Sequence, residues 1–173
     1  PEAALYRVTG KTKMRSGSAS NTSNPRNVYR ARDGKYLAVS GSTPQVAKRI
    51  FELIGRSDML TDPRFATNEQ RVKHRELVDE AVGAWFAEHD HDEALKIMRE
   101  AGATVGPIFS PADAAEDPHF AARGVTVDAD DADYGALPMH NIVPRMSGTP
   151  GVWQRPAPKI GEHNAEILQE LGL

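Results

Sequence analysis

Small polar residues fill one stretch of the chain, and their types suit the binding of an anion. From Arg15 to Asn24 the residues after the arginine are all Ser, Asn, Gly, Ala or Thr. Such side chains bury little apolar area, which predicts an exposed loop. Small side chains and backbone N–H groups let a ligand approach closely, and a guanidinium holds phosphate or carboxylate through paired hydrogen bonds. The sequence therefore predicts a binding loop, with a mobile linker as the alternative.

Two other clusters contain metal-ligating side chains. His89, Asp90, His91 and Asp92 follow one another between two predicted helices, and imidazole and carboxylate both suit zinc or iron. Further ligands would have to come from elsewhere in the chain, so an exposed capping loop is favoured over a metal site. The acidic run Asp128 to Asp133 lacks the glycine and the closing glutamate of a calcium loop, which favours a solvated turn. We expect no bound metal.

Motifs of the common nucleophilic and phosphate-binding enzymes are absent from the sequence. There is no G-x-S-x-G, no Gly-rich phosphate loop with its lysine and no H-E-x-x-H. The chain has no cysteine, which excludes thiolate chemistry and fits a reducing compartment. No apolar run approaches the roughly 20 residues that span a bilayer. We expect a cytoplasmic protein with no membrane partner.

Charge is unevenly spread along the 173 residues, whose net charge is −3. Residues 1–32 carry seven basic residues and one acidic residue, whereas the remainder is acidic. A basic arm indicates an anionic partner, and pairing with the acidic body of the same fold is the alternative. Nucleic acid is disfavoured, because no aromatic residue lies between Arg7 and Asn27 to stack on a base.

A hairpin should hold the end of the polar loop. Val28 to Arg32 and Lys35 to Ser40 are strand-like runs, and Asp33-Gly34 between them predicts a type I′ turn. Pro25 fixes the entry to the first strand. A polar loop leading into a rigid hairpin is typical of a binding loop mounted on a scaffold.

Helical and extended segments alternate after the hairpin, which predicts an α/β fold. We expect a helix capped at Ser42-Thr43-Pro44 and ended by Gly55, then one long helix capped by Asn68, and a third helix ended by Gly102. Beyond these we expect a strand over 104–109, a short helix over 110–116, a strand over 125–128, a proline-rich extended arm over 137–159 and a final helix after residue 161. The arm and the final helix need another domain to pack on.

Sequence motifs in a fixed order resemble one enzyme family. They are R-S-G, P-R-N-V-Y-R-A-R-D-G-K-Y-L-A-V, I-G-R-S-D-M-L-T-D-P-R-F-A-T-N-E-Q-R-V-K-H-R, A-G-A-T-V-G-P-I-F-S, D-P-H-F-A-A-R-G, P-R-M-S-G-T-P and A-P-K-I-G-E-H-N-A-E-I-L-Q-E-L-G. From residue 15 onward the chain is similar to the class III CoA-transferases, which include formyl-CoA transferase, carnitine CoA-transferases and α-methylacyl-CoA racemase.

The resemblance implies that this chain is the carboxy-terminal part of a longer polypeptide. It would comprise a linker and active-site loop (1–23), a small α/β domain (24–128) and an arm with a helix that return to a Rossmann-like large domain (129–173). The family forms interlocked homodimers. Its substrates are a coenzyme A thioester and a carboxylic acid, with no tightly bound cofactor.

The resemblance also implies how the loop would act. The family nucleophile is an aspartate of the amino-terminal part, which has no counterpart here, so we expect no catalytic residue in these residues. A mobile loop closes over the reacting carboxylate and keeps water out. Here that loop would be Ser16 to Ser23, with Arg15, Gly17, Ser18 and Asn21 as the expected substrate-binding residues. Gly17 is its one glycine, whereas the loop of formyl-CoA transferase is glycine-rich.

Other functions remain open at this point. Racemisation by proton abstraction beside the thioester carbonyl, or a CoA-linked dehydration, would use the same scaffold. A free-standing module that binds an anion or nucleic acid is a more remote alternative. A transferase needs the nucleophilic aspartate and a racemase needs an acid–base pair, so residues outside this sequence would separate them.

Overall fold

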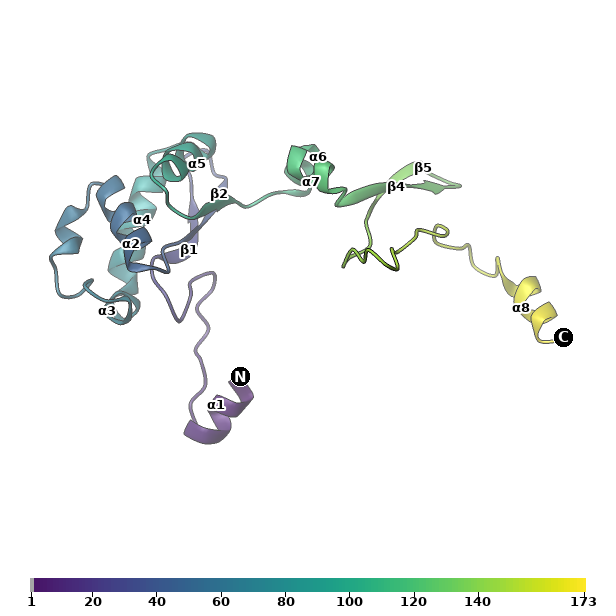
Figure 1. Cartoon of the computed structure of the whole chain (residues 1–173), viewed down its shortest axis with the longest axis horizontal. Coiled ribbons are helices and arrows are strands. Elements are labelled where there is room, and N and C mark those ends of the chain that lie inside the picture. Colours follow the sequence, from purple (N-terminus) through teal and green to yellow (C-terminus); the bar gives the residue numbers. More distant parts are fainter. Residues whose placement is uncertain (1) are drawn as a thin grey trace. The chain divides into compact units, whose positions relative to one another are not determined.

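The computed structural model describes residues 2–173, which divide into two compact units. The first extends to Ile108 and the second is Phe109–Leu173, so the division falls before the predicted boundary at 128. The first unit contains α1 (Glu2–Thr9), β1 (Arg26–Arg30), β2 (Tyr36–Ser40), α2 (Pro44–Leu53), the 3-10 helix η1 (Ser57–Leu60), α3 (Asn68–Lys73), α4 (Arg75–Ala87), α5 (His91–Glu100) and β3 (Val105–Pro107) (Figure 1). The second contains α6 (Pro111–Glu116), α7 (Pro118–Arg123), β4 (Thr126–Asp131), β5 (Gly135–His140) and α8 (Asn164–Glu170).

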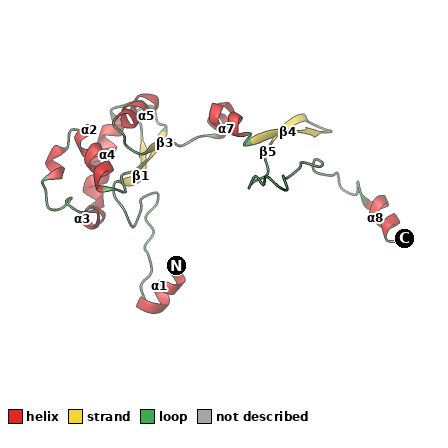
Figure 2. Cartoon of the chain, viewed as in Figure 1, coloured by secondary structure: helices red, strands yellow, loops and turns green. Residues whose placement is uncertain are grey.

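A three-stranded antiparallel sheet in the order β1-β2-β3 supports the first unit, with helices packed on one of its faces (Figure 2). Alternation along the strands sends Tyr29, Leu37 and Val39 into the core. The helices contribute Ile50, Phe51, Met59, Val78, Val82, Phe86 and Met98 to the core, and Phe65 reaches it from the loop before α3. This mixed architecture confirms the α/β fold class that periodicity predicts.

The hairpin forms, but its turn is not type I′. That turn needs a positive φ at both central residues, and among the described residues only glycines have positive φ. Gly34 (φ 87°) donates its N–H to Ala31 O at 3.0 Å, and Ala31 N–H donates to Lys35 O at 2.8 Å. The connection is therefore a longer loop closed by a glycine bulge, in which Asp33 keeps a negative φ.

Helix α2 begins and ends where the sequence predicts. The Thr43 side chain accepts the N–H of Val46, and Pro44 occupies the first turn. Gly55 (φ 73°) ends the helix, because its left-handed conformation lets Arg56 N–H reach Phe51 O at 2.8 Å. Gly102 ends α5 in the same way, as predicted.

The predicted long second helix is wrong, since two helices stand in its place. Thr67, rather than Asn68, caps α3 by accepting the N–H of Gln70. His74 has φ −107° and ψ 32°, outside helical values, and separates α3 from α4. No proline or glycine marks this break, so residue type alone gave no signal for it.

Three segments predicted from composition to be turns, loops or an extended arm lie partly in regular elements instead. Asp128 to Asp131 lie in β4, which pairs with β5 in a two-stranded sheet, so the acidic turn is shorter than expected. Pro138 opposes Asp128 in that sheet, where β5 interrupts the predicted extended arm. His91 and Asp92 begin α5 rather than a capping loop. Residues 125–130 alternate apolar and polar, which favours a strand beyond Asp128, but the acidic composition of the run outweighed this signal.

The second unit has little core of its own. Within residues 109–173, all of which the structure describes, Ala129 is the buried residue. Ile160 and Leu173 are exposed within this chain, as is the stripe Ile167, Leu168 and Leu171 on and beside α8. Such apolar exposure is typical of surfaces that another chain or domain covers.

Candidate functional site

The polar loop is folded back on itself rather than extended. Ser16 Oγ donates to Ala19 O at 2.7 Å, and Ala19 N–H donates to Ser16 O at 3.1 Å. Gly17 lies in this turn with φ 60°, a left-handed conformation that favours glycine. A Cβ there would meet nothing within 4 Å, so conformation rather than space requires the glycine.

The end of the loop is buried, which corrects the prediction of an exposed loop through residue 24. Ser23 and Asn24 are 6% and 2% exposed. Asn68 clamps this end, because its Nδ2 donates to Thr22 O at 2.8 Å and its Oδ1 accepts from Asn24 N–H at 3.2 Å. Arg71 Nε donates to Asn24 O at 2.7 Å. Asn24 can be buried here because the helices satisfy its backbone N–H, its carbonyl and its Nδ2.

Asp79 of α4 joins the loop to the sheet. Its Oδ1 accepts from Asn24 Nδ2 at 3.2 Å and from the Tyr29 hydroxyl at 2.7 Å. Its Oδ2 accepts from Asn27 Nδ2 at 3.0 Å. Asn27 Oδ1 in turn accepts the hydroxyl proton of Ser18 at 2.6 Å. Side chains of the loop, β1 and α4 thus form one connected network, in which the amide orientations follow from the acceptor-only carboxylate.

Burial shifts the pKa of two side chains at this end of the loop. Burial raises the pKa of the Tyr29 hydroxyl far above its ordinary value, and the neighbouring Asp79 raises it further. Tyr29 therefore remains a hydrogen-bond donor to the carboxylate at any physiological pH. Burial lowers the pKa of Arg71, although an arginine stays cationic in proteins.

The four predicted substrate-binding residues are all exposed, but their local environments differ. Ser18 is tied to Asn27, as described above. Asn21 Nδ2 donates to the Met14 carbonyl at 3.4 Å, and its Oδ1 accepts from Arg75 Nη1 at 3.3 Å. Gly17 lies at the turn, and Arg15 precedes it. The structure thus brings three of them onto one short loop and ties Ser18 to β1 and Asn21 to α4.

A groove opens beside Ser18 on the face of the sheet away from the helices. It has a volume of about 460 Å³. Small residues floor it, since Val28, Ala38 and Gly106 oppose one another across the strands. Its remaining lining residues are Arg26, Asn27, Val39, Ser40, Thr104 and Val105.

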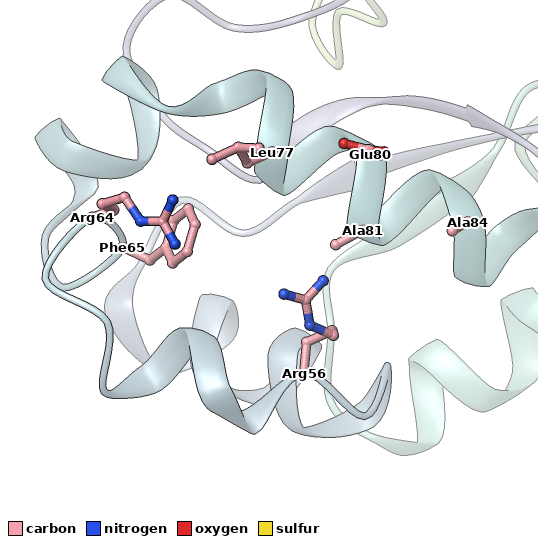
Figure 3. Close-up of a pocket in the computed structure, with 7 residues that line it drawn as sticks. All are labelled: Arg56, Arg64, Phe65, Leu77, Glu80, Ala81 and Ala84. Carbon is pink, nitrogen blue, oxygen red and sulfur yellow. The ribbon is translucent and has the colours of Figure 1, made fainter.

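A second hollow, of about 340 Å³, lies between Phe65 and α4 (Figure 3). Two guanidiniums border it, and each forms a salt bridge with a nearby carboxylate. Arg56 Nη2 lies 2.8 Å from Asp58 Oδ2, and Arg64 Nη2 lies 2.6 Å from Asp62 Oδ2. These arginines hold the pKa of both carboxyls below the usual range. Because the charges are already paired, the hollow has no strong attraction for an anion.

The histidine and aspartate cluster shows no metal-binding arrangement. No group of three or more His, Asp or Glu residues within 2–173 has the geometry to hold a metal ion. The His89 ring stacks on Trp85 with centroids 4.0 Å apart, and its Nδ1 lies 2.8 Å from Trp85 O. The His91 ring pairs with Asp92 at 2.7 Å. Both imidazoles thus make side-chain or backbone contacts within the first unit.

Sequence reasoning missed the residues that anchor the loop. Asn68, Arg71, Arg75 and Asp79 each bond to the loop or to β1, and they recur every three or four positions. That spacing places polar side chains on one face of a helical segment. The apolar stripe of the same segment is the stronger sequence signal, and it gives no indication that this polar face also makes tertiary contacts.

Comparison with known proteins places the chain in a family. The family model described as "CoA-transferase family III" matches residues 1–164. The chain belongs to CoA-transferase family III. It is 33% identical over 166 residues to succinyl-CoA–D-citramalate CoA-transferase from Chloroflexus aurantiacus, and 31% identical over 166 residues to succinate–glutarate CoA-transferase from Agrobacterium fabrum. These matches confirm the resemblance that the sequence motifs indicate.

A solved structure supports the same assignment for this family III chain. It is a CAIB/BAIF family protein from Brucella suis, with a TM-score of 0.78 and 28% identity, and the match covers 98% of this chain and 43% of that one. Each of the two curated relatives is likewise matched over 96% of this chain but 41% of its own length. The chain thus spans about two fifths of the length of the relatives it matches. No helix within residues 2–173 is long and apolar enough to cross a membrane.

Proposed function

We propose that this chain forms part of an enzyme that moves coenzyme A from an acyl-CoA thioester to a carboxylic acid. The C–S bond of the donor thioester breaks and a C–S bond forms on the acceptor, while the donor leaves as a carboxylate. One thioester and one carboxylate are consumed and one of each is produced, so no oxidant or tightly bound cofactor is needed. The nucleophilic aspartate that the family resemblance implies lies outside these residues.

The polar loop is the observation that carries this proposal. Gly17, Ser18 and Asn21 are exposed and Ser18 lines the groove, whereas residues 22–24 are fixed to α3 and α4. A loop with one fixed end and one exposed end can close over a ligand without unfolding the domain below it. Ser18, Asn21 and the N–H groups around Gly17 supply donors for a carboxylate, and Arg15 supplies positive charge.

We further propose that the second unit packs on a large domain and that the complete enzyme is an interlocked homodimer in the cytoplasm. The exposure of Ile160, Leu168 and Leu171 within this chain supports a covered position in the assembly. The basic arm, residues 1–32, would then face the acidic groups of the substrates or of the large domain.

Thioester exchange tests the function. The polypeptide that contains this sequence is incubated with succinyl-CoA and a panel of dicarboxylic acids, and new CoA thioesters are followed by mass spectrometry. The proposal predicts a thioester of the acceptor acid together with one equivalent of released succinate. In deuterated water, exchange of a proton beside the thioester carbonyl without transfer would instead indicate the racemase chemistry and contradict the proposal.

A further inference from the structure

The hydrogen-bond network beneath the loop has a centre outside the loop itself. Asp79 is half-buried on α4 and accepts three hydrogen bonds, from Asn24, Asn27 and Tyr29. The three donors come from the end of the loop and from β1. An ionised carboxylate offers acceptors only, so each of these side chains must present a donor to it.

The carboxylate thereby fixes which way the Asn27 amide faces. With Nδ2 held by Asp79 Oδ2 at 3.0 Å, Oδ1 points away and accepts both the N–H of Val28 at 2.8 Å and the hydroxyl of Ser18 at 2.6 Å. If Asn27 turned over, its NH₂ group would face the N–H of Val28, which is also a donor. The orientation of the Ser18 hydroxyl is therefore set from α4 through Asn27.

We propose that Asp79 is a positioning residue, which acts through Asn27 to orient Ser18 and through Asn24 to fix the end of the loop that covers the reacting groups. This inference rests on the proposed function of the loop. Asp79 touches neither the exposed loop tip nor the groove, so its effect on the reaction is indirect. When the loop is held, the acyl intermediate passes to the acceptor acid; when it is loose, water competes.

The ratio of transfer to hydrolysis measures this effect independently of the folded fraction. Asp79→Asn leaves one acceptor oxygen for three donors, and the NH₂ group faces one of them. We expect the transfer-to-hydrolysis ratio to fall about tenfold, which matches the loss of one hydrogen bond of ordinary strength. Glu80→Gln is the matched control, since Glu80 is the exposed neighbour on α4 and loses the same charge. Its ratio should equal that of the wild type.

Asn27→Ala tests the same link if Asp79→Asn fails to fold, and a double variant tests whether the residues act together. Asn27→Ala removes the link to Ser18 but leaves Asn24 and Tyr29 on the carboxylate, and it should lower the ratio in the same direction. In the double variant with Ser18→Ala, the effect of Asp79→Asn should shrink, because the two residues act along one path. Full additivity of the effects of Asp79→Asn and Ser18→Ala, or an unchanged ratio in Asp79→Asn, would overturn the inference.

Hydrogen exchange separates failure of this inference from failure of the proposed function. If the wild type transfers CoA and Asp79→Asn keeps its ratio, the positioning role fails and the function stands. If the wild type shows no transfer, amide exchange of residues 18–24 decides the positioning role. Faster exchange there in Asp79→Asn than in Glu80→Gln supports it, and equal exchange refutes it.

Discussion

Arg71 is a buried cation, 3% exposed, whose hydrogen bonds go to backbone carbonyls. Its Nε donates to Asn24 O at 2.7 Å and its Nη1 to Phe65 O at 3.1 Å. Among the described residues, its Nη2 has no hydrogen-bond partner. Burying a charge with an unsatisfied donor lowers the stability of the fold. Leaving the buried carbonyls of Asn24 and Phe65 without a donor would lower it further.

Replacing Arg71 by methionine should destabilise the protein by about 2 kcal/mol, because two buried carbonyls lose their donor while a buried charge is removed. Urea denaturation followed by circular dichroism measures this change. Lys73→Met on the exposed side of α3 is the control, and its free energy of unfolding should stay within about 0.5 kcal/mol of the wild type. Equal midpoints for the two variants would show that Arg71 does not hold the loop.

Gly41 lies against Pro25 where the loop enters β1. A Cβ at this position would stand 2.7 Å from Pro25 Cγ and 2.9 Å from its Cδ, closer than real atoms approach. Gly41→Ala must therefore displace Pro25, and we expect a loss of about 1 to 3 kcal/mol of stability. Gly106→Ala is the matched control, since nothing lies within 4 Å of its added Cβ. Thermal denaturation of both variants checks this; equal melting temperatures would contradict it.

At the scale of elements, the hairpin loop is tied to the connection between α4 and α5. Arg32 and Asp90 form a bidentate pair, with Nε–Oδ1 at 2.9 Å and Nη2–Oδ2 at 2.8 Å. Arg32 also donates through Nη1 to Glu88 O at 3.0 Å. The hydrogen bonds from Arg32 lower the pKa of the Asp90 carboxyl, and its positive charge adds to this effect. Both side chains are exposed, so the pair fixes geometry more than it adds stability.

Arg32→Gln should raise the pKa of Asp90 back toward its ordinary value, which an NMR titration of the carboxyl carbons measures. Because the folded-state pKa of Asp90 is depressed, the stabilisation by the pair exists above the unfolded-state pKa and is lost as the pH falls through the folded-state pKa. The stability difference between wild type and Arg32→Gln should therefore vanish at low pH. A pH-independent difference would show that the pair acts through packing alone.

Local sequence signals predicted the bounds of single helices, but they did not predict the contacts between elements. Thr43 with Pro44, Gly55 and Gly102 bounded their helices as expected, because capping depends on neighbouring residues only. The burial of Asn24 was not predictable in this way, since its partners Asn68 and Asp79 lie far along the chain. Composition predicted a polar binding loop, and tertiary contacts decided which part of it is fixed.

At the scale of the whole molecule, the second unit exposes apolar side chains that a free surface rarely carries. On and beside α8, Leu168 is 47% exposed and Leu171 is 67% exposed within this chain. If a large domain or a second copy covers this stripe, Leu168→Lys should weaken the assembly and lower its melting temperature. Glu166→Lys on the same helix is the control and should leave both unchanged. Light scattering and thermal scans compare them; equal behaviour would mean that the stripe is not covered.

We propose above all that the polar loop of this family III chain, which is fixed at residues 22–24, closes over a CoA thioester and its carboxylate partner. Hydrogen exchange of the wild-type protein with and without succinyl-CoA tests it most directly. The amides of residues 16–21 should exchange more slowly with the thioester than without it, whereas the exchange of residues 22–24 should be the same in both states. Unchanged exchange of residues 16–21 in the presence of saturating succinyl-CoA would contradict it.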